Sequence, residues 1–268
     1  MRVQIVGKGR MGTALDHALR AAGAEVLPLA GREAGGAGSV GDGGGSPDVV
    51  LLAVPDAAIA EAAARIPAKP ASAGGPLVGH LSGATPLAPL EPHEAFSLHP
   101  LLSATGPGTR FEGAWAAVDG TSDRAREAAE GLAALLGLRT FRVNDADRAA
   151  YHAAASIAAN FLVVLEGAAE QLAATAGVPR EALAPLAAGA LANWERLGAE
   201  RALTGPVARG DEATIARQRK AVAERIPSSL SLYDAMVAAS RDLAARGGST
   251  ALPSESGQTG SPATEEST

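Results

Sequence analysis

The sequence predicts an α/β domain with a mostly parallel, doubly wound sheet, followed by an all-α domain. Over residues 1–144, short apolar runs alternate with helical patterns, the order that a parallel sheet requires. After Asn144 no strand signal remains, and long stretches with helical periodicity follow. The last residues are Ser, Thr, Gly, Pro and Glu, a composition typical of disorder. We therefore expect domains at 1–144 and 145–246 and a disordered tail at 247–268.

The chain opens with a strand–helix–strand unit. Residues 2–6 (RVQIV) predict a buried strand, and apolar residues over 11–22 recur with the spacing of one helical face. Gly23 stands where a helix-ending glycine belongs. Residues 24–29 predict a second strand, and the Gly-rich segment 33–47 predicts a flexible surface loop.

Further strands and helices continue the alternation. Residues 48–54 (DVVLLAV) are apolar almost throughout, as expected of a parallel strand covered on both faces. Asp56 is expected to cap the helix that follows. The remaining strands are expected at 77–81, 96–98, 114–118 and 139–143, and the helices at 57–66 and 123–136.

The second domain is expected to be helical throughout. Residues 145–176 carry Gly167 as their one helix-breaking residue and are apolar nearly all round, which predicts a long buried helix. Further helices are expected near 179–200, 211–225 and 228–246.

Composition excludes several classes of function. The net charge is −6 and the isoelectric point about 5.4, which argues against nonspecific nucleic-acid binding. The chain has no run of about 18 consecutive apolar residues and no hydrophobic leader, so we expect no membrane span, no signal peptide and a cytoplasmic protein. Cysteine is absent, which excludes disulfides and thiolate ligands, and no metal site is predicted.

A G-x-G-x-x-G pattern lies between the first strand and the first helix. It is formed by Gly7-Lys8-Gly9-Arg10-Met11-Gly12. In this context the first glycine permits a tight turn, the second lets a pyrophosphate approach the backbone, and the third lets helix and strand pack closely. The N–H groups that open the helix attract phosphates. The pattern predicts a dinucleotide site; the alternative is a Gly-rich turn without a ligand.

The end of the second strand indicates which dinucleotide. NAD binders place an acidic residue there, about 20 positions after the glycines. Here Gly31-Arg32 take that place, and Glu33 comes one step later. A guanidinium pairs with a 2′-phosphate by a forked contact, so we predict NADPH over NADH, with Lys8 or Arg10 assisting. The alternative is a solvated Arg32.

Polar residues follow other strand ends. Val54 and Pro55 end a central strand at its carboxyl edge, where open parallel sheets bind ligands, and we expect them beside the nicotinamide ribose. Ser82 and His99 follow two later strands and are candidates to bind a substrate carbonyl or carboxylate. A turn cap and a core histidine are equal alternatives, and for His80 the core reading is favoured.

The long helix carries a line of polar residues. His152, Ser156 and Asn160 recur at i, i+4 and i+8, among Ala, Ile, Phe, Leu and Val. Buried polar groups cost free energy unless they are hydrogen-bonded, and lining a cleft would satisfy them. Asn160 could donate to an oxygen that gains negative charge, and His152 could supply a proton. Hydrogen bonds between helices are the alternative.

The segment 203–211 (LTGPVARGD) joins two helices. Asp211 is expected to cap the second of them. Arg209 is a candidate clamp for a substrate carboxylate by bidentate geometry, and Thr204 is assigned to the same site. The alternative for Arg209 is a surface residue in a constrained turn.

Six segments together resemble a bacterial family that joins a Rossmann-like domain to a C-terminal helical domain of unknown function. They are GKGRMG at 7–12, LLAVPDAAI at 51–59, HLSGA at 80–84, SLHPL at 97–101, YHAAASIAAN at 151–160 and LTGPVARGD at 203–211. The resemblance implies a fold like that of ketopantoate reductase, pyrroline-5-carboxylate reductase, the β-hydroxyacid dehydrogenases and prephenate dehydrogenase. In those relatives the substrate lies in a cleft against the helical domain, often within a dimer.

The chain departs from these relatives at one position. Ketopantoate reductase and the β-hydroxyacid dehydrogenases place a catalytic Lys one turn before an Asn that Asn160 matches, but Ser156 stands at the position of that Lys. No Lys occurs between Lys69 and Lys220. The proton donor is therefore His152, or a water held by Ser156 and Asn160.

The combined prediction is an NADPH-dependent oxidoreductase that acts on a small carboxylate-bearing substrate. Reduction of a 2-oxo acid such as ketopantoate is the first choice. A prephenate- or arogenate-like dehydrogenase and an imine reductase are alternatives, and a dinucleotide-binding sensor without turnover is an alternative of another class. A homodimer is expected by analogy with the relatives.

Overall fold

The computed structural model describes residues 1–31, 46–68 and 75–249. Arg32, nearly all of the predicted loop at 33–47 and residues 250–268 of the predicted tail lie outside these described residues. The chain forms two compact units, which we call the α/β unit (residues 1–161) and the helical unit (residues 162–268).

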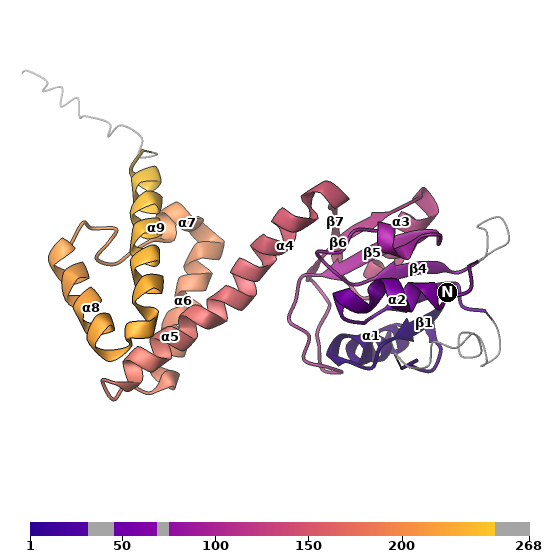
Figure 1. The fold of residues 1–268 in the computed structure, drawn as a ribbon, viewed down its shortest axis with the longest axis horizontal. Coiled ribbons are helices and arrows are strands. Elements are labelled where there is room, and N and C mark those ends of the chain that lie inside the picture. Colours follow the sequence, from indigo (N-terminus) through magenta and orange to yellow (C-terminus); the bar gives the residue numbers. More distant parts are fainter. Residues whose placement is uncertain (32–45, 69–74, 250–268) are drawn as a thin grey trace, which may run out of the picture. The chain divides into compact units, whose positions relative to one another are not determined.

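The α/β unit is built on a seven-stranded sheet, which confirms the predicted fold class (Figure 1). The strand order is β2-β1-β3-β4-β5-β6-β7, and every neighbouring pair is parallel except β5 and β6. The strands are β1 (Arg2–Val6), β2 (Glu25–Val26), β3 (Val49–Leu52), β4 (Leu77–His80), β5 (Ala95–Pro100), β6 (Trp115–Gly120) and β7 (Arg139–Arg142). The predicted strand at 24–29 is reduced to two residues, although Leu27 and Ala30 still donate backbone hydrogen bonds to the carbonyl oxygens of Val3 and Ile5 on β1.

Helices cover both faces of the sheet. They are α1 (Arg10–Ala21), α2 (Ile59–Ala64) and α3 (Asp123–Leu135). All four residues of β3 are buried, and they alternate between two apolar clusters: Val49 and Leu51 pack with α1 and α3, whereas Val50 and Leu52 pack with α2. This is the doubly wound arrangement that the unbroken apolar run indicated.

The predicted long helix is present, but it is not buried. It consists of α4 (Arg148–Ser156), a π-helical turn (Ile157–Phe161) and α5 (Leu162–Ala174). Phe161 is 56% exposed and Val163 is 71% exposed. The prediction of burial was wrong. This helix is apolar on all sides, but the described residues of the chain pack against only some of them.

This helix also has the length and composition of a membrane span. Residues Asp145–Ala174 form a 30-residue helix that contains a window of mean hydropathy 1.4, none of it buried. A window average needs no consecutive apolar run, because single polar residues such as Ser156 are averaged with their neighbours. Core helices of other proteins pass the same test, so one such helix is weak support for a membrane location.

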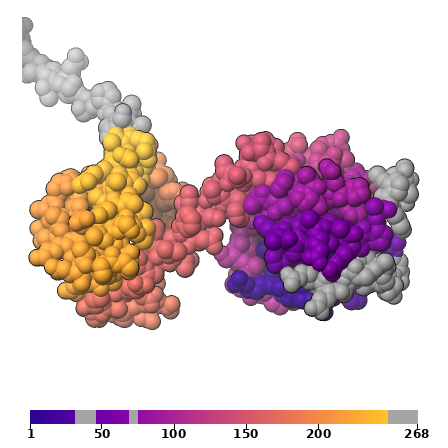
Figure 2. Space-filling model, in the orientation of Figure 1, coloured from indigo at the N-terminus to yellow at the C-terminus, as the bar shows by residue number. Residues whose placement is uncertain are grey.

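The helical unit continues with α6 (Arg180–Leu197), α7 (Ala199–Ala202), α8 (Glu212–Arg225) and α9 (Leu230–Ser249). α8 and α9 lie against each other and form one continuous face of the unit (Figure 2). Asp211 caps α8 as predicted, since its carboxylate accepts a hydrogen bond from the N–H of Thr214 at 3.0 Å.

The chain divides after Phe161 rather than at residue 144. The reason lies at Arg148, whose side chain is 2% exposed. Its guanidinium donates to the Asp145 carboxylate at 2.6 Å and to the Ser97 hydroxyl on β5 at 2.6 Å. The first turns of the long helix are thereby attached to the sheet.

Candidate active site

The glycine turn after β1 has the geometry of a phosphate cradle. Gly7 has φ +124°, and a Cβ there would lie 2.1 Å from the carbonyl oxygen of Ala53. A Cβ at Gly12 would lie 2.0 Å from the carbonyl oxygen of Gly7. At Gly9 a Cβ would meet nothing within 4 Å. Two glycines therefore allow the turn to form, while Gly9 leaves open space above the backbone.

A pocket of about 430 Å³ opens at this turn. Its lining residues are Gly7, Lys8, Gly9, Gly31, Ala53, Val54 and Pro55. Gly9 is the N-cap of α1 and has no side-chain cap, so the first N–H groups of the helix are available to an anion. The side chain of Lys8 reaches over Gly31, at the end of the β2 segment. These residues fit a dinucleotide pyrophosphate. Met11 instead packs against the core.

A second pocket, of about 570 Å³, brings together most of the predicted polar residues of the α/β unit. It is lined by Arg10, His99, Pro100, Leu101, Leu102, Ser103, Ala104, His152, Ala155, Ser156, Ala158, Ala159 and Asn160. The line of His152, Ser156 and Asn160 thus shares one pocket with His99, as expected for residues that line a cleft. Arg10, which was assigned to the cofactor, lines this pocket and is the single cation among the lining residues.

Two histidine rings meet in this second pocket. The centroids of His99 and His152 lie 6.0 Å apart, and Tyr151 Oη lies 2.5 Å from His99 Nδ1. Gly83 leaves room for both rings, because a Cβ there would lie 2.7 Å from His99 Cε1 and 2.9 Å from His152 Nδ1. His152 Nδ1 is buried and has no hydrogen-bond partner among the described residues.

Burial keeps His99 and Tyr151 neutral. Desolvation, followed by the nearby His152, lowers the pKa of His99 to about 4. Desolvation raises the pKa of Tyr151 to about 12. At neutral pH the His99 imidazole is therefore an uncharged hydrogen-bonding group, and Tyr151 keeps its proton.

Ser82 caps a turn. Its hydroxyl donates to the Asp56 carboxylate at 2.7 Å and accepts from the N–H groups of Ala84 and Thr85. Its hydroxyl hydrogen is therefore used by Asp56, and the role of Ser82 toward a substrate stays a prediction. The expectation for Asp56 was wrong, because its carboxylate faces Ser82 and makes no helix-cap hydrogen bond.

His80 is a core histidine, as favoured. Its side chain is fully buried, Nε2 lies 3.2 Å from the Pro86 carbonyl oxygen, and Nδ1 accepts from the N–H of Ser82. Desolvation, followed by the nearby Arg148, lowers its pKa to about 4.

Sequence reasoning missed Tyr151 and Arg148. Tyr151 was quoted as part of a motif, yet no role was assigned to it. A signal for Arg148 existed in Asp145, three residues earlier, since such a pair shares a helix face. Burial of Arg148 under β5 was not visible in the sequence.

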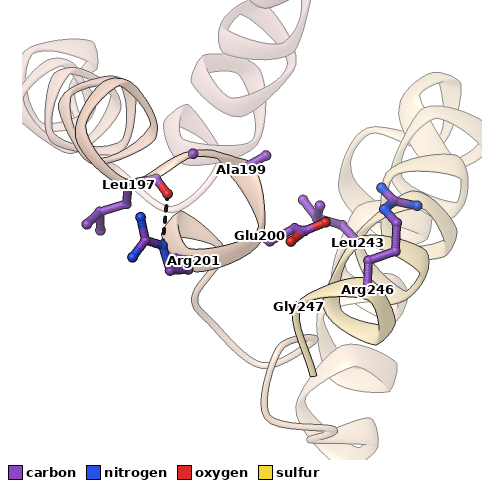
Figure 3. A pocket seen from close by; sticks show the side chains of 8 residues that line it. Leu197, Ala199, Glu200, Arg201, Leu243, Arg246 and Gly247 are labelled. Atoms are coloured by element: carbon purple, nitrogen blue, oxygen red, sulfur yellow. Dashed lines mark hydrogen bonds between the residues drawn. The ribbon is translucent and has the colours of Figure 1, made fainter. Parts of the chain in front are cut away.

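Thr204 and Arg209 lie on the helical unit, in the loop between α7 and α8, and both are exposed. They remain predictions. Another pocket of this unit, of about 760 Å³, lies between α7 and α9 and contains no predicted site residue (Figure 3). There Arg201 donates to the carbonyl oxygen of Leu197. Among the described residues, no group of three or more His, Asp or Glu could hold a metal ion.

One segment of this chain matches a known family of protein domains. Residues 114–240 match the model described as "Domain of unknown function (DUF2520)". The matched segment is similar to this family. It starts beside β6 and ends within α9, so it spans parts of both units. The predicted resemblance to a family with a Rossmann-like and a helical part is confirmed. None of the curated protein sequences matches the chain.

Solved structures share the fold over nearly the whole chain. A protein from Bacteroides fragilis with a provisional NADP oxidoreductase assignment is 20% identical, with a TM-score of 0.75 over 90% of this chain and 98% of that one. A protein from Thermotoga maritima is 22% identical, with a TM-score of 0.70 over 91% and 98%. An imine reductase from Streptomyces aurantiacus is 17% identical, with a TM-score of 0.63 over 92% and 95%.

Proposed function

We propose that the protein is an NADPH-dependent oxidoreductase acting on a small carboxylate-bearing substrate. The observation that carries this proposal is the open space at Gly9, inside a turn that Gly7 and Gly12 hold in place. The turn lies at the carboxyl end of β1, where open parallel sheets bind their ligands. The fold shared with a protein provisionally assigned as an NADP oxidoreductase supports the same interpretation.

The chain's own residues have distinct roles toward the dinucleotide. Backbone N–H groups at the start of α1 hold the pyrophosphate, and Val54 and Pro55 flank the nicotinamide ribose. Arg32 and Lys8 recognise the 2′-phosphate, which gives the preference for NADPH. A bound nicotinamide supplies hydride to an electrophilic carbon.

The second pocket holds the substrate. Arg10 is its cation and can pair with a carboxylate or with the pyrophosphate. Asn160 and His99 steady the oxygen that gains negative charge, and His152 is the proton donor assigned from the sequence. Ser156 holds a water on the same side of the helix as His152 and Asn160. Arg209 and Thr204, which lie on the helical unit, are retained as predicted carboxylate-binding residues and are not part of this pocket. Ketopantoate is the first substrate to test.

Reduction of an imine is the second candidate, because an imine reductase shares this fold over most of its length. A prephenate- or arogenate-like dehydrogenase rests on the sequence resemblance, in which His99-Pro100-Leu101 is similar to an HPM segment. A sensor without turnover would bind NADPH and oxidise no substrate. A panel of 2-oxo acids, cyclic imines and prephenate, followed at 340 nm, separates these candidates.

Dinucleotide binding is the first test of the proposal. NADPH and NADH would be titrated by calorimetry into wild type, Gly9→Ala and Gly131→Ala. Gly9→Ala is expected to weaken NADPH binding at least about tenfold while leaving the fold intact, because its methyl occupies only the ligand space. Gly131→Ala, also in open space but on α3, is the control. No association of wild type at millimolar NADPH would contradict the proposal.

Arg32→Ala tests the choice of cofactor. The variant is expected to lose the preference for NADPH, because its forked contact with the 2′-phosphate is removed. An unchanged ratio of the two dissociation constants would contradict this part of the proposal.

We also propose a cytoplasmic homodimer that pairs through the helical unit. The support is the shortage of core in that unit, where Ile215 and Val222 are the buried apolar side chains among described residues 162–247. Leu186 is 72% exposed and Trp194 is 57% exposed. A second copy would cover such a face, and light scattering of the purified chain would measure the mass.

A further inference from the structure

Within the described part of the chain, the hydroxyl of Tyr151 has one hydrogen-bond partner, which is His99. Tyr151 Oη and His99 Nδ1 are 2.5 Å apart, and the two rings meet edge to face with centroids 5.5 Å apart. Phe141, on β7, packs against the Tyr151 ring with a centroid distance of 5.8 Å. The phenol is thus held from both sides, and among the described residues its oxygen makes no other hydrogen bond.

The proton in this hydrogen bond belongs to the phenol. A neutral imidazole has one donor and one acceptor nitrogen, whereas a phenol can donate or accept. If Nδ1 carried the proton, two hydrogens would face each other unless the Tyr151 hydroxyl turned its own hydrogen away, and that hydrogen would have no acceptor among the described residues. If Tyr151 donates, its hydroxyl hydrogen and the Nδ1 lone pair satisfy each other. The proton of the neutral imidazole then sits on Nε2.

The surroundings keep His99 uncharged. His152 and Arg148 oppose a positive charge on His99, and so does His80, while Asp56 favours one. Desolvation outweighs the contribution of Asp56, and the pKa of His99 falls to about 4. Tyr151 keeps its own proton because burial raises its pKa to about 12. Both partners of the hydrogen bond are therefore neutral at pH 7.

We propose that Tyr151 is a positioning residue that fixes His99 in the tautomer with its proton on Nε2. His99 then presents an N–H donor to the second pocket, which it lines together with Arg10 and Asn160. Among the described residues, Nε2 has no hydrogen-bond partner. The role toward a substrate oxygen rests on the proposed oxidoreductase function, whereas the tautomer does not.

The same pair provides a second proton path, alternative to donation by His152, and this path also needs no lysine. When a substrate oxygen becomes an alkoxide, the Nε2–H bond breaks and its proton passes to that oxygen. Nδ1 takes the phenolic proton in the same step, which leaves a neutral imidazole in the other tautomer. The tyrosinate then regains a proton from water, since the Tyr151 side chain is only half-buried.

The experiment is ¹H–¹⁵N correlation NMR of the full chain labelled at histidine, recorded at pH 7 without ligand. The chain has five histidines, and the His99 signals are assigned by their loss in His99→Gln. We expect wild-type His99 to be neutral with the proton on Nε2. Tyr151→Phe should convert it to a mixture of tautomers. Tyr233→Phe removes the other tyrosine hydroxyl of the chain and should change nothing at His99.

Two results would overturn the proposal. One is a proton on Nδ1 in the wild-type protein. The other is an unaltered His99 spectrum in a Tyr151→Phe variant whose circular dichroism shows a native fold. Failure of wild type to bind NADPH would overturn the proposed function and leave the tautomer result standing, so the two outcomes are distinguishable.

Discussion

The two units of this chain place their apolar residues differently. In the α/β unit they are collected in two clusters on either face of the sheet, whereas described residues 162–247 bury Ile215 and Val222 and expose Val163 and Leu186. Parallel strands must be joined by crossover segments, which are usually helices, and these helices bury the faces of the sheet. A helix that is apolar all round does not determine which other segment will bury it. Apolar content alone therefore does not show where a core will form.

Each unit contains one tryptophan, which lets the comparison be measured. Trp115 lies on β6 of the α/β unit, and Trp194 lies on α6 of the helical unit. Trp194→Phe leaves fluorescence that reports the α/β unit, and Trp115→Phe leaves fluorescence that reports the helical unit.

The largest expected effect comes from truncating leucines of different exposure. Leu132 is 0% exposed on α3, Leu135 is 38% exposed on the same helix, and Leu186 is 72% exposed on α6. Leu132→Ala should lower the free energy of unfolding at Trp115 by about 3 kcal/mol, through lost burial and a cavity. Leu135→Ala should cost clearly less, and Leu186→Ala should not move the Trp115 transition. Urea titrations measure all three; equal costs at positions 132 and 135 would contradict the assigned core.

Acid should weaken the α/β unit through His80. Its pKa is about 4 in the folded unit and 6.5 when unfolded, so the unfolded state binds more protons between these values. The free energy of unfolding is then highest above pH 6.5 and falls as pH falls towards 4. Between pH 7 and pH 5, wild type should lose roughly 2 kcal/mol more than His80→Gln at the Trp115 reporter. Parallel losses in the two proteins would argue against a neutral buried His80.

If a second copy of the chain covers the helical unit, dilution should lower the stability of the helical unit and leave that of the α/β unit unchanged. At the Trp194 reporter, each tenfold dilution at concentrations well above the dissociation constant should lower the apparent free energy of unfolding by about 1.4 kcal/mol of dimer. The Trp115 transition should stay in place. A Trp194 transition that is independent of concentration would count against the homodimer.

Helix caps should give the smallest effects. Ser122 caps α3 and accepts from the N–H of Ala125 at 3.1 Å, while Asp211 caps α8. Ser122→Ala should cost about 1 kcal/mol, seen at Trp115 alone. Asp211→Ala should destabilise only the unit that Trp194 reports. If either variant shifts both transitions equally, the two units unfold as one.

The glycine turn and the polar line of the candidate site could be predicted from the sequence because both depend on local sequence patterns. The glycine turn is specified by backbone conformations that a short segment determines, and the polar line on the long helix follows from helical periodicity. The hydrogen bond from Ser82 to Asp56 joins residues far apart in the sequence, and no local pattern indicated it. The structural roles of Tyr151 and Arg148 depend on hydrogen bonds to residues of β5, about 50 residues earlier in the chain.

The order of strands and helices, the glycine turn and the caps at Ser122 and Asp211 arise from interactions between residues near in sequence, and the sequence alone determined them. The pairing of His99 with Tyr151, the presence of Arg10 and Asn160 in one pocket and the exposure of the long helix were decided by tertiary structure. These depend on which distant surfaces meet. Hydrophobic periodicity predicts which face of an element is buried, but it does not predict which other segment packs against that face.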